Sequence, residues 1–138
     1  MHFAEIVPSF QYEKELNYFQ LVVPTKDTVC YEHFVKQFIE IRSHIFITGV
    51  TGTGKTIMTE NTIHNMHETV LEVKMSFSSQ TASKSVQIML ESKLQQQRKK
   101  GQIMLIPPPG KRMAVLIDDI NMPMVETYGA QPPIELLR

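Results

Sequence analysis

The sequence has little of what marks several common classes of protein. Its 138 residues include one cysteine, Cys30, and no tryptophan. A single cysteine excludes an internal disulfide, and no secretion signal is visible from Met1 to Phe10, so we expect a protein of the cytosolic compartment. No apolar run approaches the ~18 residues that a membrane helix needs. The formal net charge is zero, which gives no reason to expect nucleic acid or an anionic membrane as main partner.

What the sequence does contain is an alternation of two hydrophobic spacings. Residues 45–48 and 113–117 are short apolar runs, and residues 71–77 alternate apolar and polar side chains, so all three predict strands. Helical spacing predicts helices over about 27–42, 54–66 and 82–100, the first capped by Asp27 or Thr28 and the last stopped by Gly101. Helix and strand in turn indicate a parallel α/β sheet with right-handed crossovers.

The run GVTGTGKT, residues 49–56, matches the complete pattern of a phosphate-binding P-loop between a predicted strand and a predicted helix. Glycines let main-chain N–H groups face inward, and the helix start adds its positive dipole end. The expected role of Lys55 is to reach the β- and γ-phosphates, and that of the Thr56 hydroxyl is to ligate Mg²⁺. The expected nucleotide-binding residues are Gly49, Val50, Thr51, Gly52, Thr53, Gly54, Lys55 and Thr56.

The apolar strand 113–117 ends at two carboxylates, Asp118 and Asp119. Ligand sites in open α/β sheets form at such strand ends, so Asp118 is the expected second Mg²⁺ residue. Asp119 stands where many AAA+ ATPases have a glutamate that orients the attacking water. Aspartate is one methylene shorter, and a misplacement of ~1 Å can cost on the order of a hundredfold in rate. We therefore expect tight ATP or ADP binding with slow hydrolysis, and Asp119 as a weakened catalytic candidate.

Five stretches together resemble the third AAA+ module of a dynein heavy chain. The resemblance covers nearly the whole chain, and the LIDDINMP stretch is more similar to axonemal than to cytoplasmic dyneins. The stretches are GVTGTGKT, FSSQTAS, PPPGKRM, LIDDINMP with YGAQPPIELLR, and the upstream LVVPTKDTVCYEHF. The resemblance implies a P-loop NTPase fold of three α/β/α layers, with only the first three core strands in this chain: a lead-in at 1–20 and a partial AAA+ large subdomain at 21–138.

The resemblance also implies a function. Dyneins are minus-end-directed microtubule motors built on a ring of six AAA+ modules, in which the third module binds nucleotide as a regulatory switch. The implied partners are neighbouring modules of the same heavy chain, dynein intermediate and light chains, and microtubules through the parent protein. The implied location is the cytoplasm, the cytoskeleton and the ciliary axoneme. Val23, Pro24 and Thr25 become candidates for the adenine pocket, whereas Asn121 and Gln131 belong to the family pattern without an assigned role.

Further elements of an AAA+ module are expected to follow Arg138, which predicts a fragment with little hydrolysis of its own. Three alternatives stay open. Another P-loop ATPase or AAA+ module has the same motifs. A P-loop GTPase or small-molecule kinase is a second possibility, although the Asn-Lys-x-Asp guanine reader of a GTPase is absent from the sequence. The third alternative is a non-catalytic interaction fragment.

Overall fold

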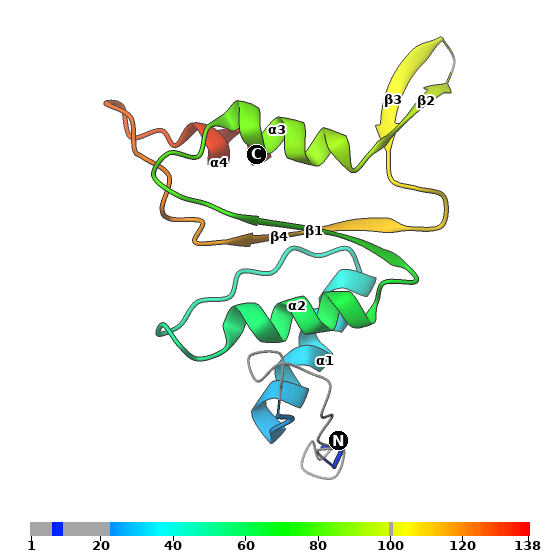
Figure 1. Ribbon diagram of the computed structural model, residues 1–138, viewed down its shortest axis with the longest axis vertical. Coiled ribbons are helices and arrows are strands. Elements are labelled where there is room, and N and C mark those ends of the chain that lie inside the picture. Colours follow the sequence, from blue (N-terminus) through cyan, green and yellow to red (C-terminus); the bar gives the residue numbers. More distant parts are fainter. Residues whose placement is uncertain (1–6, 10–22, 100) are drawn as a thin grey trace, which may run out of the picture. The chain divides into compact units, whose positions relative to one another are not determined.

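The computed structural model describes residues 7–9, 23–99 and 101–138, and the predicted lead-in at 1–20 lies mostly outside them. The chain divides into two units, Met1–Asn65 and Met66–Arg138. The elements, labelled in Figure 1, are α1 (Lys26–Glu40), α2 (Lys55–Asn65), β1 (Val70–Ser76), α3 (Ser83–Ser92), β2 (Gln95–Lys99), β3 (Gln102–Ile106), β4 (Arg112–Asp118) and α4 (Pro132–Leu137). No helix in the described ranges is both long and apolar enough to cross a membrane.

The second unit is built on a parallel pair of strands. β1 and β4 pair in register from Val70 with Arg112 to Ser76 with Asp118. Because side chains alternate along a strand, one face of the pair carries an apolar row from both strands. That row forms the core with the inner faces of α3 and α4 and consists of Val73, Met75, Phe77, Met113, Val115 and Ile117, packed with Val86, Leu90, Ile120 and Ile134. The predicted α/β class with a parallel sheet is thus confirmed.

The predicted strand at 45–48 is wrong. Residues 43–50 adopt neither helix nor strand, and the sheets among the described residues are the pairs β1–β4 and β2–β3. Phe46 is 77% exposed. An Ile-Phe-Ile run has high strand propensity, but a strand exists only where a neighbour completes its hydrogen bonds. Here no such ladder forms, so the expected three-strand parallel order reduces to two strands.

In the first unit, α1 packs on α2. Thr25 is the N-cap of α1: its hydroxyl accepts from the Thr28 N–H at 3.2 Å, while the Thr28 hydroxyl accepts from the Thr25 N–H at 2.7 Å. This reciprocal capping box corrects the predicted caps, since Thr28 is the partner of the cap and Asp27 lies within the first turn. Of the apolar residues of α1, Val35 is buried, whereas Tyr31, Phe34 and Phe38 are exposed.

The predicted helix over 82–100 is confirmed in its first part and wrong in its second part. α3 ends at Ser92, and the glutamine-rich run that follows forms β2, which pairs antiparallel with β3. Gly101, expected to stop a helix, has φ of 82° and lies at the hairpin turn between these strands. The apolar run of β3 offers main-chain partners that local helical spacing cannot reveal, so pairing overrides the weak strand propensity of glutamine.

Candidate nucleotide site

The phosphate loop is held open by its glycines. Gly52 and Gly54 have φ of 81° and 77°, in the left-handed region that side chains rarely adopt. A Cβ at either position would meet nothing within 4 Å. The requirement for glycine is therefore conformational, because the backbone must turn to direct its N–H groups to one side, and space for a side chain is not limiting.

Lys55 folds back over its own loop. Its Nζ donates to the main-chain oxygens of Val50 at 2.7 Å and Gly49 at 3.0 Å, and lies 3.4 Å from the Thr53 hydroxyl. The Thr53 hydroxyl in turn donates to the Val50 oxygen at 2.9 Å. An ammonium has three donors, so the lysine and the loop form one closed set of hydrogen bonds. This arrangement keeps a positive charge at the loop without any help from a distant residue.

α2 begins directly at the loop. The first intrahelical bond runs from the Met58 N–H to the Gly54 oxygen at 3.0 Å, so the N–H groups that open α2 lie at the loop's carboxyl end. Thr56 is the second residue of α2 and is half-buried. Thr59 donates its hydroxyl to the Lys55 oxygen at 2.8 Å, so this side chain contacts the same turn. The sequence-predicted loop residues are therefore brought together on one loop and one helix end.

The two predicted carboxylates lie at the end of β4, where Asp118 is the last strand residue and Asp119 follows it. Asp118 pairs with Ser76 of β1, and its main-chain oxygen accepts from the Phe77 N–H at 3.0 Å. Its carboxylate Oδ1 accepts from the Asp119 N–H at 3.1 Å. Asp119 has φ of 53° and is exposed, whereas Asp118 is half-buried. The chain thus turns sharply at Asp119, which aspartate tolerates better than most residues, and the two carboxylates lie in different surroundings.

Gln131 is a residue to which the sequence pattern assigns no role. Its side-chain amide donates to the Pro123 oxygen at 2.6 Å and lies 3.5 Å from the Asn121 oxygen. It precedes Pro132, the first residue of α4, so this amide ties the loop after Asp119 to the start of a helix. The feature of the sequence that could have indicated this role is a glutamine directly before a proline that begins a helix. Asn121 takes part only through its main-chain oxygen in this contact.

At the carboxyl end of β1, a turn adds hydroxyl groups beside the acidic strand end. The Thr81 hydroxyl accepts from the Ser78 N–H at 2.8 Å, and the Thr81 N–H donates to the Ser78 oxygen at 3.1 Å. A shallow hollow of about 240 Å³ lies between this turn and α3. It is lined by Met75, Ser76, Phe77, Ser78, Gln80, Thr81, Ser85, Val86 and Met89. Residues 78–81 thus form a hydrogen-bonded turn, and the N-cap of α3 is Ala82.

The chemistry of the predicted metal residues suits Mg²⁺, because the Thr56 hydroxyl and the Asp118 carboxylate are both oxygen donors. They belong to different units of the chain. Within the described ranges, no cluster of three or more His, Cys, Asp or Glu side chains could hold a metal ion. Mg²⁺ bound to either residue fits the mode in which nucleotide phosphates and water supply most ligands. Of the adenine-pocket candidates, Thr25 caps α1 and Val23 is exposed.

Comparison with known proteins gives consistent relatives. Residues 10–138 match the family described as P-loop containing dynein motor region. The chain is 38% identical to human dynein axonemal heavy chain 6 over 135 residues, which is 96% of this chain and 3% of that protein. It is 40% identical to human dynein axonemal heavy chain 3 over 120 residues, covering 86% of this chain and 3% of that protein.

Human dynein axonemal heavy chain 10 is 35% identical over 136 residues, covering 98% of this chain and 3% of that protein. The chain therefore spans only a small part of the length of the curated relatives that it matches. The relatives are axonemal, in agreement with the resemblance of the LIDDINMP stretch. The family match includes the phosphate loop, β4 and α4. On this match, the chain belongs to the family of P-loop containing dynein motor regions.

Proposed function

We propose that this chain is the nucleotide-binding part of a regulatory AAA+ module, the third, in an axonemal-type dynein heavy chain. Its ligand is ATP or ADP with Mg²⁺, held by residues 49–56. Asp118 supplies the second protein oxygen toward the metal. The family match and the axonemal relatives support the motor context. The position of this segment along the parent chain, counted in P-loops from the amino end, tests the assignment to the third module.

The observation that carries the proposal is the closed loop around Lys55. Its ammonium donates hydrogen bonds to the neutral main-chain oxygens of Gly49 and Val50 and to the Thr53 hydroxyl. Phosphate oxygens are charged, and charge-assisted hydrogen bonds are roughly twice as strong as neutral ones. A polyphosphate can therefore displace these carbonyls, and the N–H groups at the start of α2 add donors to the same phosphates.

Substitution of Lys55 tests the proposal. Hydrogen bonds to charged groups contribute ~1.5–3 kcal/mol, so Lys55→Ala is expected to weaken MgATP binding by roughly tenfold to a hundredfold. Binding is measured by the rise in unfolding temperature, since a ligand at ~100 times its Kd adds about 2.7 kcal/mol. Lys84→Ala, which removes an exposed lysine of α3, is the matched control. Equal ATP-induced stabilisation of both variants would contradict the proposal.

Slow turnover is the second part of the proposal. Asp119 is exposed, follows Asp118 through a left-handed turn, and is one methylene shorter than the glutamate common in AAA+ ATPases. We therefore expect Asp119→Glu to raise ATP hydrolysis in the parent ring, by up to the order of a hundredfold that ~1 Å of placement can cost. Unchanged turnover at this site in an ATPase assay counts against Asp119 as a water-orienting residue.

The proposed partners and location of this chain are those of the dynein motor that would contain it. Neighbouring AAA+ modules of the same heavy chain are the expected direct partners, and an arginine from a neighbouring module can accelerate phosphoryl transfer by about 10³ to 10⁵. Intermediate and light chains, and microtubules, are expected partners of the whole motor. The expected location is the ciliary axoneme, within the cytoplasm and its cytoskeleton. Fluorescent tagging of the parent heavy chain tests this location, and absence of signal from cilia would contradict it.

A further inference from the structure

The positive charge of this neutral chain is concentrated around one hairpin. From Ser92 to Ile117 the sequence has no acidic residue, although the chain has 14 acidic and 14 basic residues in all. The six basic residues of this stretch are Lys93, Arg98, Lys99, Lys100, Lys111 and Arg112. Lys111 is engaged locally, because its Nζ donates to the His67 oxygen at 2.8 Å. We call residues 93–99 and 101–106, which carry three of these charges, the basic arm.

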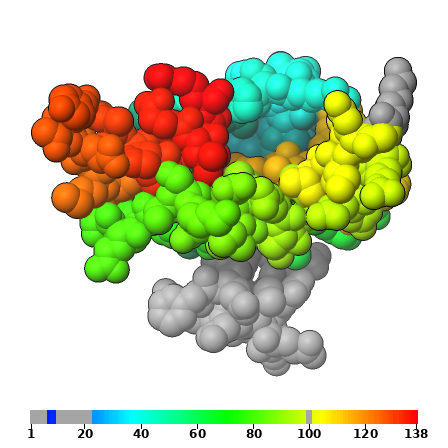
Figure 2. Space-filling view, turned by 90° about the horizontal axis from the view of Figure 1, so that it is seen from above, coloured from blue at the N-terminus to red at the C-terminus, as the bar shows by residue number. Residues whose placement is uncertain are grey.

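The basic arm extends away from the core of its unit. Figure 1 shows β2 and β3 as a ribbon that leaves the end of α3 and projects from the parallel pair. Neither strand joins the β1–β4 ladder, so each keeps an outer edge of main-chain N–H and C=O groups without a strand beside it in the described sheets. Figure 2 shows the hairpin at the molecular surface next to α3. A lone two-stranded hairpin is marginally stable in water.

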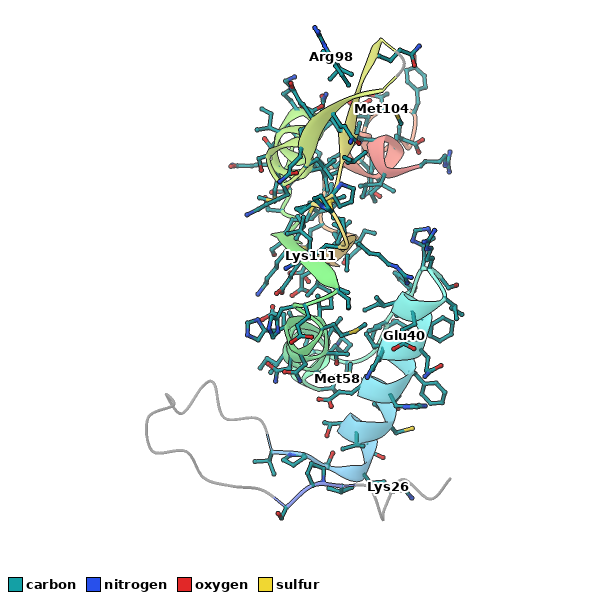
Figure 3. The ribbon with its side chains drawn as sticks, turned by 90° about the vertical axis from the view of Figure 1, so that its right-hand side faces the viewer. Lys26, Glu40, Met58, Arg98, Met104 and Lys111 are labelled. Carbon is teal, nitrogen blue, oxygen red and sulfur yellow. The ribbon has the colours of Figure 1, made fainter. Side chains whose placement is uncertain are left out.

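One face of the arm combines aliphatic groups with charge. Arg98 pairs with Ile103 and Gln96 pairs with Leu105, and pairs two residues apart share a face. Ile103 is 60% exposed and Leu105 is 41% exposed. Arg98 is exposed and points outward near the end of the ribbon in Figure 3. Within the described residues no carboxylate forms an ion pair with Arg98. The face therefore offers apolar area next to an exposed cation.

We propose that the basic arm docks an acidic protein surface in which carboxylates flank aliphatic side chains. Charge complementarity selects the acidic character, since like charges at an interface are strongly disfavoured. The arm contains no aromatic residue, so it lacks the stacking groups with which proteins hold single-stranded nucleic acid. Its open strand edges cannot enter a bilayer core, where every main-chain group must be paired. A protein partner can pair those edges, cover Ile103 and Leu105, and face Arg98 with a carboxylate.

The test uses a fluorescent peptide in which glutamate alternates with leucine, titrated into the full chain and followed by anisotropy at low and high salt. The double variant Lys93→Glu with Arg98→Glu is expected to bind about tenfold more weakly and to lose its salt dependence. The pair Ile103→Ser with Leu105→Ser is expected to bind more weakly while the salt dependence remains. Arg98→Gln, a milder change on an exposed side chain, is expected to give an intermediate affinity.

Lys84→Glu is the matched control, because it reverses an exposed charge on α3 outside the arm. Binding by the double charge variant that equals binding by this control overturns the proposal. Binding of phosphatidylserine vesicles or single-stranded DNA as tight as that of the peptide, and equally sensitive to Arg98, overturns it as well. ATP-induced stabilisation of the arm variants is expected to stay unchanged, so failure of the docking proposal is distinguishable from failure of the nucleotide site.

Discussion

The two predicted halves of the nucleotide site, one in each unit of the chain, are built in opposite ways. The loop at 49–56 is organised by contacts within itself, through Lys55 and its own main-chain oxygens. The run at 45–48 before it pairs with no strand in the part of the chain that the structure describes. Asp118, in contrast, ends a strand held by a full parallel ladder over a buried core. Local contacts can persist in a loosely held segment, whereas a ladder acts only when the unit is folded. Damage to the first half should therefore affect binding, and damage to the second should affect stability.

Two phenylalanines give the largest expected effect. Phe77, which follows β1, is 2% exposed, whereas Phe46 before the phosphate loop is 77% exposed. Phe77→Ala removes a buried side chain and is expected to cost about 3–5 kcal/mol of unfolding free energy. Phe46→Ala is expected to stay within ~0.5 kcal/mol, as exposed substitutions usually do. Denaturant unfolding of both variants measures the difference. A comparable cost for Phe46→Ala would mean that residues 45–48 form a buried strand, and the contrast between the halves would fail.

Substitution of two glycines distinguishes the cost of backbone strain from the loss of nucleotide binding. Gly52 in the phosphate loop and Gly101 in the hairpin have φ of 81° and 82°, and a Cβ added to either would meet no atom within 4 Å. Alanine at either position is expected to cost a similar ~1–2 kcal/mol of backbone strain. Only Gly52→Ala should also weaken MgATP binding, by about tenfold, because the loop N–H groups lose their direction. ATP titration by calorimetry measures this, and equal affinities in the two variants would contradict a backbone-built cradle.

The comparison also explains what can be predicted from sequence. Residues 49–56 and Asp118 are recognisable because glycine spacing, the flanking helix and the end of an apolar run are local features. Residues 45–48 and 95–99 are mispredicted because their state depends on pairing with distant segments. The glutamines of β2 form a strand because they pair with the apolar run of β3. Gly101, which was expected to end a helix, lies at the turn between these two strands. The Gln131 contact escapes prediction since it links groups eight residues apart through one amide.

Loss of the Gln131 amide is expected to have a smaller effect, on the stability of the loop that follows Asp118 and Asp119. Gln131→Ala removes the 2.6 Å bond to the Pro123 oxygen, in a partly buried setting, and is expected to cost ~1 kcal/mol. Hydrogen exchange of the Met122 N–H, which donates to the Asp119 oxygen at 2.9 Å, should speed up as the loop loosens. Gln87→Ala removes an exposed bond of equal length, to Glu91 on α3, and should cost only ~0.2–0.5 kcal/mol. Unaltered exchange at Met122 in Gln131→Ala would show that the loop is held by other contacts.

The smallest expected effect lies in the first unit and concerns pH. Burial raises the pKa of Glu32 on α1 above its ordinary value of 4.5. The folded chain therefore keeps this proton to a higher pH than the unfolded chain does, so the contribution of Glu32 to the free energy of unfolding is present at low pH. It is lost as pH rises from the unfolded pKa through the folded one.

Glu32→Gln removes the titrating group and is expected to flatten this decline, giving slightly higher stability at neutral pH. The effect is modest because the side chain is only half-buried. Thermal unfolding across a series of mildly acidic buffers measures the slope. Glu40→Gln on the same helix leaves Glu32 in place and should retain the decline. A slope that survives in Glu32→Gln would assign the pH dependence to another group, and the first unit would then be insensitive to the burial of this carboxyl.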